Sequence, residues 1–179
     1  MKKCKLQMVV TVIGACGVLC VNGQGDENTD INSFYRAKEF SIDAFASGSL
    51  GQETLENASG ARVEHNGRLG AGVGLNYYFT RYVGIGGDAY TENTAHNFID
   101  SASGNVLLRL PIGDTGIAPY IFGGAGHQFD QVSQSFGQGG AGIEFRFMKH
   151  AGFIVEARYV FADKTDNYGV ARAGIRLNF

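Results

Sequence analysis

Charged side chains recur in the middle of alternating segments along this chain, and they are the residues best able to do chemistry. The set holds four carboxylates and five guanidiniums: Asp43, Asp88, Glu144, Glu156, Arg109, Arg146, Arg158, Arg172 and Arg176. Glu144 and Arg146 are two residues apart, as are Glu156 and Arg158, and this spacing puts both members on one face of a strand. Paired carboxylates can act as general acids or bases. A nearly balanced set of acids and bases is more typical of ion pairs that stabilise a fold than of a catalytic site. We therefore predict that these residues form an ion-pair network in the interior of the protein.

Four histidines could serve as catalytic bases or metal ligands: His65, His96, His127 and His150. Enzymes that deacylate lipid A use a His and a Ser two residues apart on one strand, with a Glu that orients the His as in a triad. No histidine of this chain is followed two residues later by Ser. A metal site needs several converging ligands, and His65 beside Glu64 does not supply them. We predict no catalytic residue, no metal site and no bound cofactor.

Two short motifs match known signatures without their structural context. Residues 137–142 match G-x-G-x-x-G, which binds dinucleotides only where a strand precedes it and a helix follows. An alternating segment follows here, so we exclude that reading. Residues 57–59 match a glycosylation acceptor, which we interpret as a coincidence in a loop.

Eight alternating segments must position the charged side chains. They cover residues 38–48, 68–80, 82–92, 104–110, 120–129, 138–148, 153–162 and a last segment that ends at Phe179. Successive side chains of a strand point to opposite faces, so seven of the segments have one apolar face and one face of glycine and polar residues. The segment 120–129 is ambiguous and shows no such division. The pattern predicts an all-β, eight-stranded antiparallel up-and-down transmembrane β-barrel, and it leaves open a variant with an extra pair of strands.

The surroundings of the apolar face decide between two barrels. In a soluble, lipocalin-like binding barrel that face points inward around a core or ligand. In a small membrane barrel it meets lipid, and the charged face fills a lumen wide enough only for side chains. Seven aromatic residues near predicted strand ends favour the membrane barrel, because they resemble an interfacial girdle: Tyr77, Tyr78, Phe79, Tyr82, Phe147, Phe153 and Phe179.

Long and short connections mostly alternate along the chain, as in outer-membrane barrels that have outer loops and inner turns. The long ones are residues 49–67, 93–103 and 130–137, whereas 80–81 and 149–151 are short. The long connections are the candidate regions for contact with a surface ligand. None is strongly aromatic, so the sequence names no specific partner.

The first residues resemble a secretory signal peptide. Lys2, Lys3 and Lys5 precede an apolar stretch that ends near Gly23. We therefore predict a signal peptide at 1–23, a short periplasmic leader at 24–37 and the barrel domain at 38–179. A second interpretation is lipidation at Cys16, which follows Ile13-Gly14-Ala15.

Composition excludes several functions for the part of the chain after residue 23. All three cysteines lie before that point, which excludes disulfides and thiolate metal sites. Without its three early lysines the chain has 12 basic and 17 acidic residues, a net charge of −5. That acidity argues against a nucleic-acid partner.

The last strand resembles the C-terminal signal that the barrel-assembly machinery reads in outer-membrane proteins. In that signal a polar residue is followed two later by Gly, and apolar residues stand at the end and two before it. The matching positions are Arg172, Gly174, Leu177 and Phe179. Together with the glycine-alternating segment 70–79, they make residues 38–179 resemble the small eight-stranded outer-membrane barrels: the outer-membrane protein A barrel domain, protein X and the opacity-type surface antigens.

The resemblance implies an integral protein of a Gram-negative-type outer membrane, in contact with membrane lipid. It implies a non-enzymatic, structural or surface-interaction role in which outer loops face the exterior. The alternatives are a small-solute porin, then a lipid-modifying barrel enzyme or a soluble binding barrel.

Overall fold

The computed structural model describes residues 34–50, 52–56, 62–66, 69–91, 99–129, 133–163 and 166–179. The predicted signal peptide, the lipidation position Cys16 and most of the predicted leader lie outside these residues. No helix with the length and hydropathy of a membrane span occurs among the described residues.

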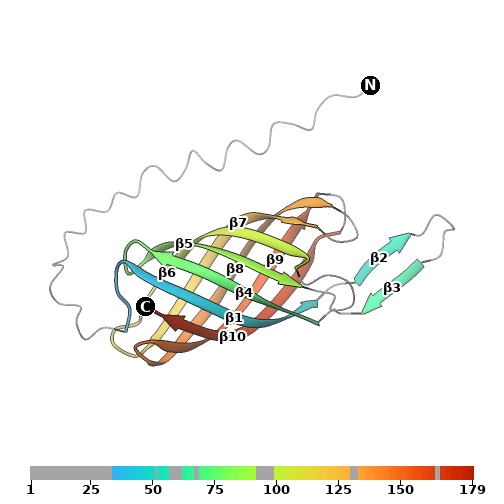
Figure 1. Ribbon diagram of the computed structural model, residues 1–179. Helices are drawn as coiled ribbons and strands as arrows, with labels where there is room; N and C mark the ends of the chain where they lie inside the picture. Colours follow the sequence, from blue (N-terminus) through green and yellow to red (C-terminus); the bar gives the residue numbers. More distant parts are fainter. Residues whose placement is uncertain are drawn as a thin grey trace. The chain divides into compact units, whose positions relative to one another are not determined.

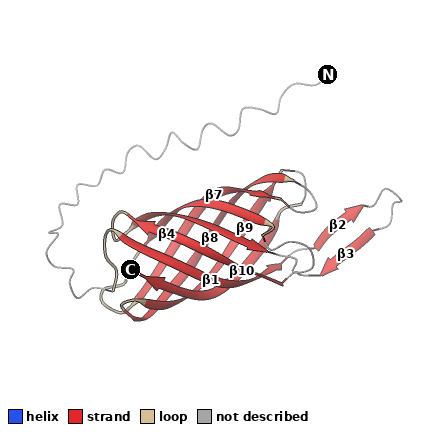
Figure 2. Ribbon diagram, in the orientation of Figure 1, coloured by secondary structure: helices blue, strands red, loops and turns tan. Residues whose placement is uncertain are grey.

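Eight strands form a closed antiparallel barrel in the order β1-β10-β9-β8-β7-β6-β5-β4 (Figures 1 and 2). Their bounds are β1 Glu39–Leu50, β4 Leu69–Tyr78, β5 Val83–Thr91, β6 Ser101–Arg109, β7 Ile117–Gln128, β8 Gln134–Met148, β9 Ala151–Ala162 and β10 Tyr168–Asn178. The first and last strands close the barrel, with Ile42 opposite Leu177 and Ser47 opposite Arg172. The predicted eight-stranded up-and-down barrel is confirmed, and closure leaves no unpaired sheet edge.

Two kinds of connection define the two ends of the barrel. The turn end holds residues 79–82, 110–116 and 149–150, together with the start of β1 and the end of β10. The first of these turns is closed by Thr80, whose Oγ1 accepts hydrogen bonds from the backbone N–H of Tyr82 at 3.2 Å and of Val83 at 3.0 Å. The loop end holds the remaining connections.

The connection predicted at 49–67 contains two further strands. β2 (Gln52–Glu56) and β3 (Arg62–Asn66) pair as a separate two-stranded sheet, in the register Leu55 opposite Val63. The barrel therefore has eight strands and not ten, because this extra pair does not join it. Both strands are short and largely polar, so they lack the apolar face on which the periodicity depends.

Three predicted strand boundaries at the loop end were wrong, also because apolar alternation is missing there. β6 begins at Ser101, inside the predicted loop 93–103, and β8 begins at Gln134, inside the predicted loop 130–137. The predicted loop 49–67 also begins too early, because β1 continues to Leu50. Backbone pairing extends these strands into polar or glycine-rich sequence, where no apolar alternation marks them.

The two faces of the barrel have opposite chemistry. Outward side chains are apolar and accessible, as for Leu75 (53% exposed) and Ile121 (56% exposed), whereas the inward residue Arg109 is 0% exposed. This inside-out arrangement overturns the soluble binding barrel, whose apolar face would point inward. One predicted girdle residue was misplaced, because Tyr78 points inward and is fully buried.

Glycines on the inward face of β4 make room for large neighbours. Gly72 lies opposite Phe45 on one side and Tyr90 on the other. A Cβ at Gly72 would lie 2.5 Å from Cβ of Tyr90 and 2.7 Å from Cζ of Phe45. The rings of these two residues hold Arg172 between them, with its guanidinium carbon 4.3 Å and 4.2 Å from the ring centres. The absence of a side chain at Gly72 therefore leaves room in the lumen for the two rings that contact Arg172.

We expect Gly72→Ala to lower the free energy of unfolding by about 1–3 kcal/mol, because the added methyl group overpacks the lumen. Urea titration of the barrel in lipid vesicles, followed by the mobility of the folded band on gels, measures the change. Gly104→Ala is the matched control, since a Cβ there meets no atom within 4 Å, and we expect it within about 1 kcal/mol of wild type. Equal effects of the two substitutions would contradict the packing argument.

Candidate functional site: the charged lumen

The structure places all nine predicted network residues on the inward face of the barrel and gives each an ion pair. The described lumen adds a tenth charged residue, Glu39, which pairs with Arg109 and Arg146. Glu39 was not predicted, because it stands just before the first apolar residue of β1. Its position two residues before Ser41 and four before Asp43 would have placed it on the same inward face.

One group of charges, the turn-end cluster, consists of Glu39, Asp43, Arg109, Glu144, Arg146 and Arg176. Arg146 donates to both carboxylate oxygens of Glu39, at 2.6 Å and 2.7 Å, and its Nε lies 2.5 Å from Oε1 of Glu144. Arg176 donates to both oxygens of Asp43, at 2.7 Å and 2.6 Å, and Nη1 of Arg176 lies 3.0 Å from Oε2 of Glu144. Glu144 thus joins two bidentate pairs, and bidentate pairs are the strongest form of this interaction.

A second group, the central cluster, consists of Asp88, Glu156, Arg158 and Arg172. Asp88 binds Arg158 at 3.3 Å and Arg172 at 3.2 Å, while Glu156 binds Arg158 and lies 3.8 Å from Nη1 of Arg172. Each cluster holds equal numbers of acids and bases. The described lumen is therefore electrically neutral in both parts.

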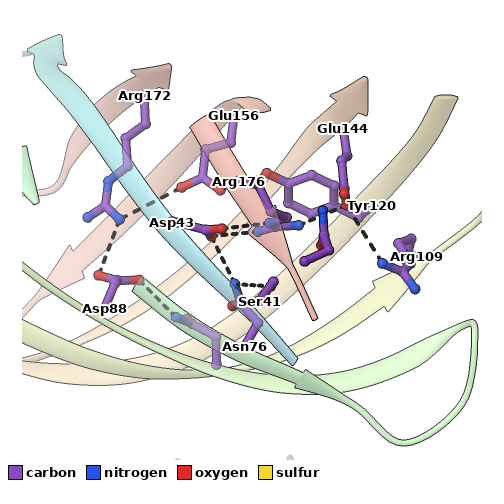
Figure 3. Close-up of polar contacts among 12 residues, drawn as sticks. Ser41, Asp43, Asn76, Asp88, Arg109, Tyr120, Glu144, Glu156, Arg172 and Arg176 are labelled. Atoms are coloured by element: carbon purple, nitrogen blue, oxygen red, sulfur yellow. Dashed lines mark hydrogen bonds and ion pairs between the residues drawn. The ribbon is translucent and has the colours of Figure 1, made fainter. Parts of the chain in front are cut away.

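Tyr120 contacts both clusters (Figure 3). Tyr120 donates from its hydroxyl to Oε2 of Glu156 at 2.9 Å, and the guanidinium carbon of Arg176 lies 5.6 Å from the Tyr120 ring centre. Asn76 donates to Oδ2 of Asp43 at 2.8 Å. A cavity of about 20 Å³ lies between the clusters, which is room for about one water molecule rather than an aqueous channel.

The segment before β1 fills the lumen at the turn end. Tyr35 is 0% exposed and donates from its hydroxyl to the backbone oxygen of Gly116 at 2.7 Å. Its ring lies 4.7 Å from the guanidinium carbon of Arg109 and 4.1 Å from that of Arg146. Burial raises the pKa of the Tyr35 phenol, so the hydroxyl remains a donor at neutral pH.

The predicted domain boundary at residue 38 misses this contribution. The backbone oxygen of Phe34 accepts a hydrogen bond from Arg146, so residues assigned to the leader pack inside the barrel. Their sequence shows no alternation, and no strand signal could have placed them there.

Apolar side chains fill the lumen toward the loop end. Phe136, Val160, Tyr168 and Val170 form a cluster in which each residue is at most 8% exposed. The lumen is thus occupied by Tyr35, two neutral ion-pair clusters and an apolar group in succession.

The described histidines lie away from the charged lumen. The Nε2 atom of His127 is 3.0 Å from Oγ of Ser133, and the Nδ1 atom is 3.4 Å from Oγ of Ser135. No carboxylate is recorded on His127 among the described residues. Nδ1 of His150 lies 3.0 Å from the backbone oxygen of Asn178, while His96 and the side chain of His65 lie outside the described residues. The described part of the chain contains no group of three or more His, Cys, Asp or Glu side chains that could hold a metal ion.

The four residues of the predicted assembly signal divide between the two faces of β10. Arg172 and Gly174 face the lumen, whereas Leu177 (45% exposed) and Phe179 (61% exposed) face outward. The Phe179 ring lies 6.4 Å from that of Phe40 across the closing strands.

Comparisons with known proteins show the fold and nothing finer. No protein-family model matches the sequence, and no curated protein matches it. The chain is similar to the N-terminal β-barrel domain of OprF from Pseudomonas aeruginosa, at 15% identity and a TM-score of 0.63 over 80% of this chain and 99% of that one. It is similar to the outer membrane protein OprG from the same organism, at 13% identity and a TM-score of 0.60 over 84% and 99% of the two chains.

A third solved structure agrees with these two. The neisserial surface protein A is 11% identical, with a TM-score of 0.55 over 78% of this chain and 97% of that one. The chain therefore has the fold of the small eight-stranded outer-membrane β-barrels.

Removing the Arg176 guanidinium tests the turn-end cluster. We expect Arg176→Met to lower the free energy of unfolding by about 3–5 kcal/mol, because it leaves Asp43 buried without its cation. Urea titration in lipid vesicles measures the change. The double variant Asp43→Asn/Arg176→Met should recover part of the loss, since it leaves no unpaired charge at position 43. An unchanged stability of Arg176→Met would show that the ion pair is not part of the folded barrel.

Tyr35 offers a test of the plugged turn end. We expect Tyr35→Phe to cost about 0.5–1.5 kcal/mol of stability by removing one buried hydrogen bond. Tyr35→Ala should cost about 3–5 kcal/mol, because it also removes the ring between two guanidiniums. Tyr82→Ala, at an exposed aromatic of the same end, is the control, and the same urea titration compares all three. A loss for Tyr35→Ala no larger than that for Tyr82→Ala would argue against a packed plug.

Proposed function

We propose that this chain is an integral outer-membrane β-barrel without catalytic activity, which anchors and displays its loop-end connections at the cell surface. The observation that carries the proposal is the inside-out barrel with a filled lumen. An apolar exterior suits lipid, and a packed interior offers neither a channel nor a substrate pocket. The loop-end connections are then the parts free to meet a partner.

Aromatic residues at both ends support the placement in a membrane. At the turn end, exposed rings form pairs such as Tyr77 with Phe79 and Phe147 with Phe153. At the loop end, Tyr159 pairs with Phe161. Aromatic girdles flank the apolar band of outer-membrane barrels, and their short turns face the periplasm. The turn end is then periplasmic and the loop end external.

A pore for small solutes is the weaker alternative. Conduction would require a continuous aqueous path, but Arg109, Arg146 and Arg176 lie in the lumen with nearly complete burial. Opening a path would separate charges whose partners lie within 3.0 Å, such as Arg146 and Glu39. We infer a closed barrel in the resting state.

A lipid-modifying activity has little support. His127 contacts two serines at the loop end, but a hydrolytic triad also needs a group that orients the base. The contact to Ser135 is long at 3.4 Å, and both serines are exposed. We interpret the group as polar contacts between β7 and β8.

Two kinds of partner follow from the proposal. The barrel-assembly machinery would read Arg172, Gly174, Leu177 and Phe179, because the last two present apolar side chains on the outward face of the closing strand. A surface ligand would meet residues 51–68, 92–100 and 129–133, which are the predicted contact loops with their bounds revised by the observed strands.

Electrophoresis with and without boiling tests the proposal. We expect outer-membrane extracts to contain an unboiled band that runs faster than the boiled one, because a closed barrel resists unfolding by dodecyl sulfate. A soluble periplasmic protein with no shift would overturn the membrane placement.

Planar-bilayer recording separates the closed anchor from the pore. We expect the purified, folded protein to show no steady conductance steps, since ion pairs occupy the lumen. Reproducible steps from protein that also shows the shifted band would overturn the closed barrel in favour of a porin.

A further inference from the structure

The two ends of the barrel carry opposite charge. Connections at the loop end, residues 51–68, 92–100, 129–133 and 163–167, contain eight acidic and three basic residues. One of the acids, Asp100, is buried, and the other residues carry a net charge of −4. The turn-end segments, residues 34–38, 79–82, 110–116 and 149–150, contain four basic residues and one acidic residue, a net charge of +3. The lumen between them is neutral, so it contributes no net charge to either end.

The basic residues of the turn end form what we call the basic rim: Arg36, Lys38, Arg81 and Lys149. Arg36, Lys38 and Lys149 are exposed, and Arg81 is half-buried. The acidic residue of the same end is Asp114. Glu39 also lies there, but it is 1% exposed and bound to Arg109 and Arg146, so its charge is neutralised inside the barrel.

Exposed aromatic residues lie beside the basic rim along the chain. Arg81 is followed by Tyr82 and lies over its ring, with 5.2 Å between the guanidinium carbon and the ring centre. Lys149 lies two residues after Phe147, and Lys38 lies two before Phe40. Aromatic rings of this kind lie at the level of the lipid headgroups. Basic side chains beside them are therefore at the depth of the headgroup phosphates.

We propose that the basic rim binds the phosphate groups of anionic phospholipids in the leaflet that the turn end faces. This inference rests on the proposed function, because it needs the barrel to span a membrane with its turns at one surface. Lys and Arg near an anionic membrane surface each favour binding by a factor of about five, and salt screens the attraction. Arg adds a planar fork of donors that matches phosphate geometry.

The charges at the two ends also predict in which leaflet the barrel binds anionic phospholipids. The acidic connections repel anionic headgroups, whereas the basic rim attracts them. The barrel would thus gather anionic phospholipid around its turns and not around its loops. Asp26, Glu27 and Asp30 precede the rim in the sequence and lie outside the described residues, so the full chain must be used in any test.

Native mass spectrometry of the full chain in neutral detergent provides the test. The probe is an equimolar mixture of phosphatidylglycerol and phosphatidylcholine, and the readout is the ratio of the two lipids that remain bound. We expect wild type to retain phosphatidylglycerol preferentially. The variant Arg36→Gln/Lys38→Gln/Lys149→Gln should lose this preference by roughly tenfold or more.

A matched control removes the same charge from the other end. Arg62→Gln/Arg68→Gln/Lys164→Gln also lowers the net charge by three, and we expect it to keep the wild-type preference. An equal loss in both variants, or no loss in the rim variant, would overturn the inference. Competition by inorganic phosphate or glycerol phosphate at the same concentration as the lipid would show a site for free anions instead of lipid.

The boiling-dependent gel shift distinguishes the two proposals. Folded wild-type protein that shows the shifted band but no lipid preference would overturn the basic rim and leave the membrane barrel standing. If wild-type protein shows no shifted band, both the membrane barrel and the basic rim would be overturned. Both variants should keep the shifted band, because their substituted residues lie outside the barrel strands.

Discussion

Buried charge must be paired, and this constraint shapes the interior of the barrel. Neither lipid nor a packed lumen can solvate an isolated carboxylate or guanidinium. The described lumen meets the constraint by joining five acids to five bases in two neutral clusters. Because Glu144 contacts Arg109, Arg146 and Arg176, charges on the three strands β6, β8 and β10 depend on one carboxylate.

Packing around the ions depends on that pairing. Arg172 lies between the rings of Phe45 and Tyr90, which fit only because Gly72 has no side chain. Tyr35 covers Arg109 and Arg146 in the same way at the turn end. Cation–π contacts in a desolvated site are stronger than at a surface. The aromatic residues of the lumen thus shield the ion pairs and exclude water from them.

A neutral, filled lumen moves any function to the outside of the barrel. The side wall presents apolar residues to lipid, and the two ends carry net charges of opposite sign. A membrane with different headgroups on its two faces distinguishes such ends. Under the proposed function, the chain would be an anchor whose ends meet different chemistry, with cationic turns on one side and acidic connections on the other.

The alternation of residues determined the barrel from sequence alone, because a period of two marks the faces of a strand wherever one face is apolar. It also identified nine lumen charges, since a charge such as Arg176 between Ile175 and Leu177 can only face inward. Where alternation is missing, only the tertiary structure shows which side chains face the lumen and what they contact. Tyr120 and Phe122 of β7 are aromatic on the inward face, so their segment had no readable faces. Tyr35 and the pairing of Glu144 with three guanidiniums depend on contacts between residues far apart in the chain. No local pattern records such contacts, because they exist only once the barrel has closed.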